Sequence, residues 1–176
     1  MENMAMMNRG KLTIVFIFLL AFSAGTGAVW WQYNQQRRAM RFWGTDAAML
    51  IRHAPMVEIL KLRAVDETEK SETPLVVVND LRLSVAATKD ISDLRGLVHA
   101  RYALIEDASF DWDTSQKDCV ESWQYGFRFS ENENVATVLL DFECNRVYFA
   151  EQNCDATLTK QIMDGMRKYT AGQMSE

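Results

Sequence analysis

The apolar and polar positions divide this chain into a continuous apolar run near the N-terminus and a longer part in which the two kinds of residue are interspersed. The run Leu12–Trp31 contains no charged residue. A helix that crosses a bilayer needs about 20 apolar residues, because the hydrocarbon core is roughly 30 Å thick and a helix rises about 1.5 Å per residue. The pattern therefore predicts a transmembrane helix at 12–31, preceded by a short polar head at 1–11 that we expect to be disordered.

The flanks of the apolar run allow two interpretations. In a cleaved signal peptide, Arg9 and Lys11 would form the basic region and the small residues 26–28 would supply the cleavage site. In an uncleaved anchor, the run continues to the tryptophans at 30–31 with Tyr33 close behind, which is typical of an interfacial aromatic belt. A cleaved signal needs no such belt, so the sequence favours a single-pass anchor in the inner or plasma membrane.

The basic residues beside the run bear on its orientation. Arg9 and Lys11 precede the run, and Arg37, Arg38 and Arg41 follow it. These numbers are nearly balanced, so the positive-inside rule alone does not set the topology. Because so short a head commonly stays in the cytoplasm, we expect the C-terminal domain to be extracytoplasmic.

Small residues recur four positions apart within the run, in the pairs Ala21/Gly25, Ser23/Gly27 and Ala24/Ala28. Such pairs let two helix backbones approach closely, so Ala21, Gly25, Gly27 and Ala28 are candidate packing positions for another membrane helix. The alternative is that small residues are simply common in membrane helices and near signal cleavage sites.

The part of the chain after the run begins with a predicted helix. Residues 32–54 contain no proline and one glycine, which predicts a helical connector. Pro55 ends this helix, because proline cannot donate the helical hydrogen bond and restricts the residue before it. Residues 55–176 then form one extramembrane domain of ordinary size.

Alternating and β-branched segments predict an antiparallel sheet in this domain. Polar turn residues at Asn79-Asp80 and at 130–134 each separate two such segments, and so predict two hairpins. The predicted strands are 56–65, 75–78, 81–87, 123–129, 135–142 and 147–149, with a charged loop at 66–73.

Two segments with apolar residues three and four positions apart predict helices. The first follows a cap at Asp90 or Ser92, and the second follows a cap at Asp155 or Thr157. The predicted apolar faces are Ile91, Leu94, Leu97, Val98 and Tyr102 in the first helix, and Leu158, Ile162, Met166 and Tyr169 in the second. The order of elements predicts an α+β domain whose antiparallel sheet carries two or three helices on one face.

Aromatic residues alternate along most of the predicted strands. Such residues either pack in a core or form an exposed face that binds a protein partner, and core packing is the more ordinary outcome. They are Trp123, Tyr125, Phe127, Phe129, Phe142, Tyr148 and Phe149, with Trp112 in the segment before the hairpin.

The domain is acidic, which excludes one class of partner. From Phe42 to the C-terminus there are 14 Lys and Arg and 23 Asp and Glu residues, a net charge of −9. Nucleic-acid binding requires a basic surface, so the charge argues against it. The expected partners are the membrane and a protein, the latter bound through the membrane helix or an aromatic sheet face.

The three cysteines all lie in the last third of the chain, and none forms a C-x-x-C pair. A hairpin centred near residue 132 places Cys119 and Cys144 nearly opposite each other, 13 and 12 residues from its centre. That proximity suits a disulfide, which in turn suits an oxidising compartment. Cys154 would then be left over, as a small buried residue or in an intermolecular bridge; a Cys144–Cys154 bond is the alternative pairing.

A dense group of acidic residues at 106–121 is the one candidate metal site. Asp107, Asp111 and Asp113 could supply the oxygens that calcium prefers, although the segment lacks the spacing of an EF-hand loop. A solvated acidic loop is the more ordinary interpretation. Zinc is not expected, because neither histidine lies near the cysteines in sequence, and no cofactor is predicted.

The hairpin region resembles an uncharacterised group of bacterial proteins that share a cysteine, a strand ending like F-R-F and a following strand ending in cysteine. In this chain the matching residues are Cys119, 127–129 and the strand from Val135 to Cys144. Asp141 stands where that group often has another cysteine. The resemblance covers about 35 residues and implies a small secreted or membrane-anchored domain, with no implication for mechanism.

The sequence contains no Ser-His-Asp or Cys-His spacing and no glycine-rich phosphate loop. We therefore expect a membrane-anchored extracytoplasmic domain that acts as a protein-binding or accessory subunit. The absence of a catalytic motif favours a role other than that of an enzyme. The alternative hypothesis is a thiol- or metal-dependent site, built from Cys119, Cys144 and Cys154 or from the acidic loop 106–121.

Overall fold

The computed structural model describes residues 2–35, 38–65, 75–78, 81–113 and 119–175. These residues fall into two compact units, Met1–Arg38 and Ala39–Glu176. The predicted loop at 66–73 and the predicted turn at Asn79-Asp80 lie outside the described residues.

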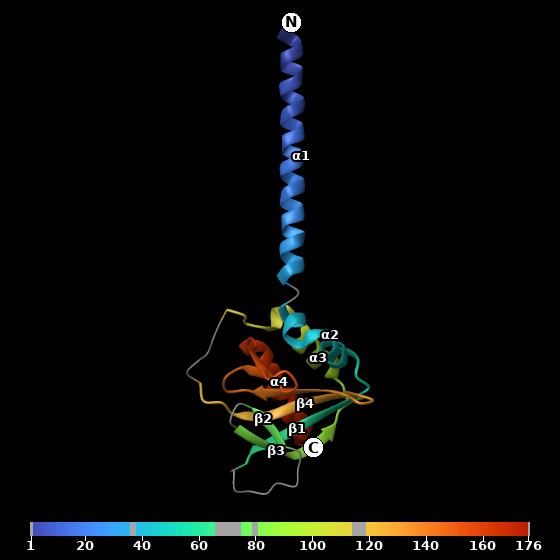
Figure 1. Ribbon diagram of the computed structural model, residues 1–176, viewed down its shortest axis with the longest axis vertical. Coiled ribbons are helices and arrows are strands. Elements are labelled where there is room, and N and C mark those ends of the chain that lie inside the picture. Colours follow the sequence, from blue (N-terminus) through green and yellow to red (C-terminus); the bar gives the residue numbers. More distant parts are fainter. Residues whose placement is uncertain (1, 36–37, 66–74, 79–80, 114–118, 176) are drawn as a thin grey trace. The chain divides into compact units, whose positions relative to one another are not determined.

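The first unit consists of one helix, α1 (Glu2–Gln35), drawn in blue in Figure 1. Its segment Lys11–Trp30 is long and apolar enough to cross a membrane, and none of that segment is buried. The predicted span, 12–31, agrees with this segment within one residue at each end. The prediction of a disordered head was wrong, because α1 already begins at Glu2: residues 2–11 contain several good helix formers and no proline.

Helix α2 (Arg38–His53), all of which except Arg38 belongs to the second unit, is the predicted helical connector. Gly44 interrupts this helix with a φ of 73° and a ψ of 162°, a conformation that side chains other than glycine strongly disfavour. The helix buries Ala39, Trp43, Ala47, Ala48 and Ile51 against the rest of the unit.

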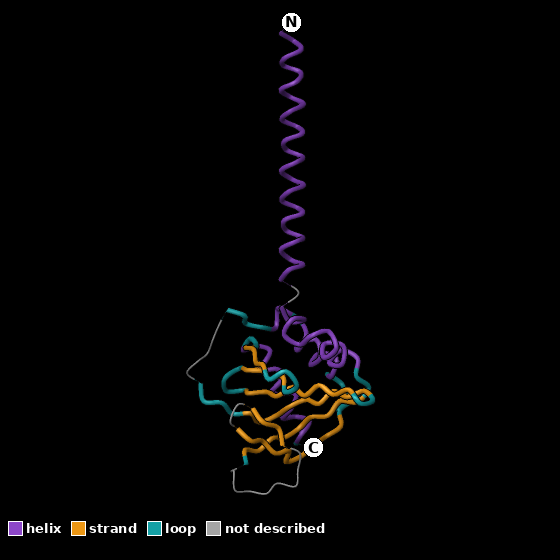
Figure 2. The backbone as a smooth tube through the Cα atoms, in the orientation of Figure 1, coloured by secondary structure: helices purple, strands orange, loops and turns teal. Residues whose placement is uncertain are grey.

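Seven strands form one antiparallel sheet in the order β2-β3-β1-β4-β5-β6-β7. The strands are β1 (Met56–Ala64), β2 (Leu75–Val78), β3 (Leu81–Asp90), β4 (Trp123–Glu131), β5 (Asn134–Asp141), β6 (Arg146–Phe149) and β7 (Cys154–Thr157). The other helices are α3 (Leu97–Ile105), the 3-10 turn η1 (Asp107–Ser109) and α4 (Lys160–Met174). Figure 2 shows this succession of purple helices and orange strands, and it confirms the predicted α+β class.

The first predicted helix of the domain starts later than expected. Asp90 accepts hydrogen bonds from the backbone N and the hydroxyl of Ser92 at 2.9 and 2.6 Å, and the Ser92 hydroxyl accepts one from Val57 N at 2.9 Å. These bonds form a turn beside β1, so neither Asp90 nor Ser92 caps a helix. The helix begins only after Gly96, whose φ is 93°.

Helix α3 also buries a different face from the predicted one. Its buried residues are Leu97, Ala100 and Leu104, whereas Val98 and Tyr102 are exposed. Ile91 and Leu97 are buried as predicted, but the prediction for Val98 and Tyr102 was wrong, because it counted the periodicity from Ile91, which belongs to the turn before the helix.

The last predicted helix is shortened by a strand that the sequence did not reveal. Cys154–Thr157 pairs with β6 as β7, and Thr159 is the residue before α4. Leu158 is buried, but it forms a bridge with Phe110 and is not part of the helix. Asp155 and Thr157 therefore lie in a strand and cap no helix.

The sheet separates two hydrophobic cores. The larger core lies between one face of the sheet and helices α2, α3 and α4, and includes Trp43, Ile51, Ile59, Leu104, Phe127, Phe129, Val138, Leu140, Phe149 and Met166. The smaller core lies on the opposite face, where the curled sheet folds over itself, and contains Leu60, Leu62, Val78, Leu83, Trp123, Leu139 and Tyr148. The two cores cover both faces of β5, and its residues accordingly form an almost continuous apolar run.

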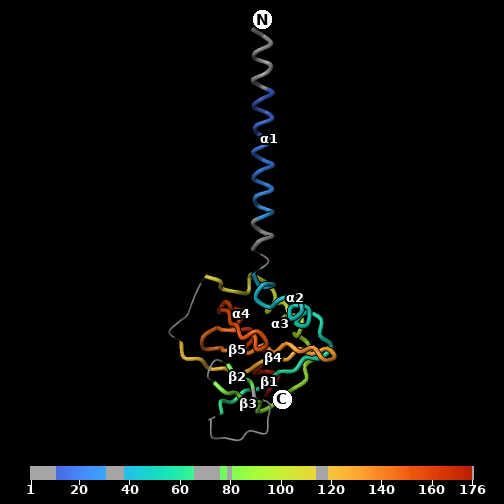
Figure 3. Tube along the Cα trace, viewed as in Figure 1, coloured from blue at the N-terminus to red at the C-terminus, as the bar shows by residue number. Residues whose placement is uncertain are grey.

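An irregularity in β4 assigns one aromatic residue to the smaller core. Strands β4 and β5 are the adjacent segments joined by a tight turn in Figure 3. The register of their pairing shifts by one residue between Trp123 and Tyr125. A shift of one residue moves a side chain to the other face of a sheet. Phe127 and Phe129 therefore face the larger core, whereas Trp123 packs beside Tyr148 in the smaller core, with ring centroids 5.7 Å apart.

Candidate functional site

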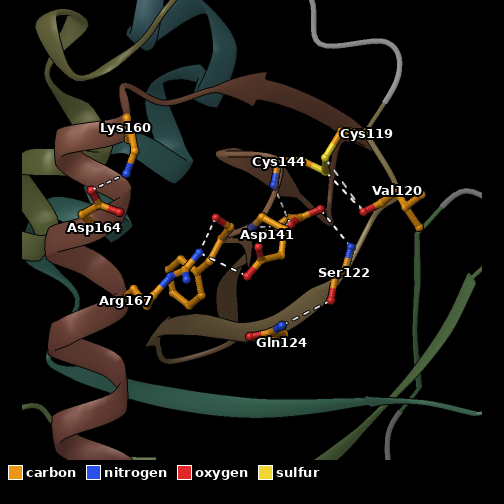
Figure 4. Close-up of polar contacts among 11 residues, drawn as sticks. Cys119, Val120, Ser122, Gln124, Asp141, Cys144, Lys160, Asp164 and Arg167 are labelled. Atoms are coloured by element: carbon orange, nitrogen blue, oxygen red, sulfur yellow. Dashed lines mark hydrogen bonds and ion pairs between the residues drawn. A yellow bond between two sulfur atoms is a disulfide. The ribbon is translucent and has the colours of Figure 1, made fainter.

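The β4–β5 hairpin brings two of the three cysteines together. Cys119 and Cys144 form a disulfide, with their Cα atoms 5.7 Å apart (Figure 4). This bond confirms the pairing that the hairpin predicted, and it leaves the alternative Cys144–Cys154 pairing wrong. The hairpin prediction worked because paired positions in the structure sum to 265 over most of the ladder, as for Phe127 and Val138, close to the sum for the two cysteines.

Asp141, at the end of β5, organises the backbone around the disulfide. Its side chain is buried; Oδ1 accepts hydrogen bonds from Glu143 N and Cys144 N at 3.0 Å each, and Oδ2 accepts one from Ser122 N at 2.9 Å (Figure 4). Backbone donors of this kind replace the water that a buried carboxylate loses. Asp141 therefore joins the segment before β4 to the turn after β5, a structural role parallel to that of the disulfide.

An arginine secures the same region from the side of β6. Arg146 pairs with Glu121 at 2.7 Å and with Asp155 at 2.8 Å, and its guanidinium lies 5.9 Å from the ring centroid of Trp123. Burial alone would lower the pKa of Arg146, but the carboxylates of Asp155 and Glu121 raise it above its ordinary value. Arg146 is thus held as a cation between two acids, which suits a structural tie.

Cys154 has no disulfide partner in the chain and is half-buried. Burial, and to a smaller extent the neighbouring Asp155, raises the pKa of its thiol. A catalytic or metal-binding cysteine needs the opposite shift, because the thiolate is the reactive form. With Cys119 and Cys144 already bonded, the cysteines give no support to a thiol-dependent site.

The three candidate calcium ligands serve different parts of the fold. Asp107 accepts a hydrogen bond from Ala39 N at 2.5 Å, Asp111 pairs through its backbone with Thr157, and Asp113 is exposed. Within the described residues, which exclude 114–118, no three His, Cys, Asp or Glu side chains are grouped in a way that could hold a metal ion. The predicted calcium site therefore has no support from the geometry.

Only some of the small residues of α1 line a groove on the surface of the helix. Ala21 and Gly25 line a groove of about 540 Å³ on the helix surface, together with Phe22, Thr26, Val29 and Trp30. Gly27 and Ala28 are not among the residues that line it. Docking of another helix at Ala21 and Gly25 thus keeps a geometric basis and stays a prediction.

The aromatic residues of the strands are packed into the two cores. Trp123, Phe127, Phe129, Phe142, Tyr148 and Phe149 are all at most 4 % exposed. Trp112 and Tyr125 are half-buried and pack against the larger core. Core packing, the more ordinary of the two predicted outcomes, is therefore what the structure has for the six buried side chains.

A cleft that the sequence did not predict lies at the other end of the β4–β5 hairpin. We call it the α2 cleft: α2 forms one wall, and the turns after β4 and after β6 form the others. It encloses about 630 Å³. Its apolar lining includes Trp43, Ala47, Leu50, Val135 and Phe149, and its polar lining includes Asp46, His53, Glu131, Asn134, Glu151 and Gln152.

Hydrogen bonds fix two walls of the α2 cleft. The Glu151 carboxylate accepts a hydrogen bond from Thr137 N, with both oxygens at 2.9 Å. Gln152 donates from Nε2 to the carbonyl of Trp43 at 3.4 Å, which links the turn after β6 to α2 beside Gly44. The cleft is therefore a built feature of the fold whose opposite walls are tied together.

A second groove, of about 380 Å³, lies between α3 and α4. Gly96, Ala100 and Gly165 leave it open, and Tyr169 lies along it. The Tyr169 hydroxyl is buried without a partner among the described residues, and burial raises its pKa. This groove offers few polar groups, so the α2 cleft is the better candidate for a binding site.

Sequence analysis could not identify the α2 cleft, because its residues come from three segments that are up to about 100 positions apart. The one local signal was Gly44 within a predicted helix, since an isolated helical glycine often has a packing reason. No protein-family model, curated protein or solved structure matches this chain. The assignment of function therefore depends on the chain's own geometry.

Proposed function

We propose that this chain is a single-pass membrane protein whose C-terminal domain lies outside the cytoplasm and binds another protein as an accessory subunit. One contrast carries the proposal. The α1 segment Lys11–Trp30 is apolar and entirely unburied, whereas the second unit buries its own core and holds the Cys119–Cys144 disulfide. An unburied apolar helix needs lipid, and a disulfide persists in oxidising compartments.

The binding role is supported by the polar groups of the domain. The buried Asp141 and the cations Arg146 and Arg167 have structural partners, and the cysteines show no activated thiol. The groove over Ala21 and Gly25 offers a place where a partner's membrane helix could pack closely. These features therefore support a role in binding a protein and give no support to a catalytic role.

Membrane insertion is tested by extraction with alkaline carbonate, which removes peripheral proteins. We expect the full chain to stay in the membrane and a Leu19→Arg variant to be released, because an arginine at the centre of a span costs about 3 kcal/mol on insertion scales. Leu19→Ala is the control and should stay inserted. Release of the unmodified chain would contradict the anchor.

Orientation is tested with reporters fused to the C-terminus. Alkaline phosphatase should be active there and a cytoplasmic fluorescent reporter should not. In parallel, the denatured, unreduced chain should show one reactive thiol, that of Cys154. Three reactive thiols, or the reverse reporter result, would place the domain in the cytoplasm.

A protein partner is tested by crosslinking in membranes followed by affinity purification of the full chain. Gly25→Leu should reduce recovery of a partner that uses the α1 groove, because leucine would fill it. Gly27→Leu is the matched control, since Gly27 is not among the residues that line the groove. A chain that is always recovered alone would argue against an accessory subunit.

A further inference from the structure

The α2 cleft combines an apolar floor with a rim that is rich in carboxylates. Leu50 and Val135 present apolar surface to the cleft, and the rings of Trp43 and Phe149 lie beneath it with centroids 5.4 Å apart. Both rings are almost fully buried, so the apolar surface open to a ligand comes from Leu50 and Val135. A ligand that fills the cleft must therefore offer an apolar body to the floor.

The rim of the cleft is predominantly acidic. Asp46, Glu131 and Glu151 line the cleft from its three walls, His53 is the basic side chain in the lining, and no lysine or arginine is among the described residues that line it. Asp46 and Glu131 have no hydrogen bond or ion pair with another described residue. Elsewhere in the domain the acids Glu121, Asp155 and Asp164 have cationic partners, which Asp46 and Glu131 lack among the described residues.

Glu151 adds a carboxylate whose position is fixed. The hydrogen bond from Thr137 N holds it at the point where β6 ends, and it satisfies only part of the carboxylate's capacity as an acceptor. A carboxylate that is positioned before a ligand arrives loses little conformational entropy on binding. The cleft is thus prepared for a cation at this wall.

We infer that the α2 cleft binds an alkylammonium or alkylguanidinium group, with its aliphatic chain over Leu50 and Val135 and its cationic end among Glu131, Glu151 and Asp46. The group can come from a small amine or from a lysine or arginine side chain of a protein partner. The inference adds a ligand class to the proposed function. It rests on that function only if the cation is a side chain of a protein partner. Binding of the small amine requires neither a membrane partner nor a particular orientation.

The inference is tested by calorimetric titration of the full chain in nonionic detergent micelles at low ionic strength. The probe is agmatine, which carries a guanidinium and an ammonium on one short aliphatic chain. We expect saturable binding, weakened about tenfold or more in the double variant Glu131→Gln and Glu151→Gln, since each charge removed from the rim costs attraction. Glutamine at 151 keeps an oxygen that can accept from Thr137 N, so the fold is expected to survive.

The matched control is the double variant Glu133→Gln and Glu143→Gln. Both residues are exposed, and neither is among the residues that line the cleft, yet the change in net charge is the same. This variant should bind agmatine with nearly unchanged affinity. Absence of saturable binding, or equal weakening in the two double variants, would overturn the inference, because the attraction would then belong to the acidic domain as a whole.

The two sources of the cation are separated with blocked tripeptides, acetyl-Gly-Arg-Gly-amide and its citrulline counterpart. Binding of the arginine peptide alone supports a partner's side chain as the occupant. Binding of agmatine with neither peptide supports a small amine as the occupant. Equal binding of both peptides would overturn the inference, since citrulline has the same shape without the charge. A failure in these titrations leaves the membrane and orientation experiments unaffected, so the two proposals fail separately.

Discussion

The two ends of the β4–β5 hairpin treat polar groups in opposite ways. At the open end, Asp141 accepts three backbone hydrogen bonds and the Cys119–Cys144 disulfide closes the loop. At the turn end, Glu131 lines the α2 cleft with no partner among the described residues. Since the same two strands build both ends, the difference lies in the local residues and not in the fold.

This comparison separates structural residues from candidate binding residues. A buried polar group that is fully paired inside the protein contributes to stability and has little left to offer a ligand. An exposed group without a partner adds little stability but keeps its capacity to bind. Variants of the paired groups at the open end should therefore change the stability of the fold, and variants of the unpaired carboxylates at the turn end should change binding alone.

The largest effect is expected for Asp141→Ala. The variant leaves the N–H groups of Ser122, Glu143 and Cys144 without their acceptor, and removing one member of a buried charged network costs about 3–5 kcal/mol. The thermal unfolding midpoint of the domain, followed by near-UV circular dichroism, measures the loss. A change below about 1 kcal/mol would mean that Asp141 is not the anchor of the open end.

The next effect is expected for the double variant Cys119→Ser and Cys144→Ser. The disulfide closes a loop with a sequence separation of 25, for which the chain-entropy estimate is about 3 kcal/mol. Equilibrium unfolding in urea, with and without reductant, compares the variant with the natural chain. Reduction should destabilise the natural chain and leave the variant unchanged; an equal effect on both would contradict a stabilising disulfide.

A smaller effect is expected at the wall of the cleft for Gly44→Ala. A side chain at a φ of 73° is strained, and its Cβ would lie 3.2 Å from Gln152 Nε2, so we expect a loss of about 1–3 kcal/mol. Gly165→Ala in α4 is the control, because its Cβ would meet nothing within 4 Å and alanine favours a helix by about 0.5–1 kcal/mol. Equal midpoints for the two variants would show that the break in α2 is not strained.

The reactivity of Cys154, in β7, tests whether its thiol is buried. Because burial raises the pKa of its thiol, the thiolate fraction near neutral pH is below that of an ordinary cysteine, and it continues to rise at pH values where an ordinary cysteine is already ionised. Alkylation of the folded chain by iodoacetamide should therefore be slow and accelerate with pH. In the denatured chain it should be fast, and equal rates in the two states would contradict the burial.

The smallest effect on stability is expected for Glu131→Gln. Glu131 is exposed and unpaired among the described residues, so the free energy of unfolding should change by no more than about 0.5 kcal/mol. The urea midpoint measures this, with the Asp141→Ala variant as the opposite extreme. A loss as large as that of Asp141→Ala would abolish the distinction between the two ends.

The parts of this fold that could be predicted depend on local spacing. The apolar span, the strand pairs and the disulfide follow from run length, alternation and the centre of one hairpin. The starts of α3 and α4 could not be predicted, because Asp90, Ser92 and Thr157 resemble helix caps in sequence but bond to neighbouring strands in space. Tertiary contacts decide such cases.

The proposed binding site could not be predicted for a related reason. The lining of the α2 cleft joins Asp46, Glu131 and Glu151 across three turns and walls, and each of these residues alone looks like an ordinary surface acid. The acidic segment at 106–121 was more conspicuous, yet Asp107 and Glu121 serve the packing of the domain. The number of acidic residues in one segment of the sequence therefore does not indicate where carboxylates without partners lie together in the fold.

The bulge between Trp123 and Tyr125 has a consequence for how this hairpin can change over time. Because one extra residue, Gln124, lies between Trp123 and Tyr125, these two side chains face opposite cores; in a regular ladder of the same length Trp123 would turn toward the helices and leave the smaller core. Insertions and deletions in most surface loops are absorbed by the loop itself. This segment is held by the ladder with β5, the disulfide and Arg146, so a one-residue insertion finds no loose loop to absorb it, and the length of the segment is under stricter constraint than its composition.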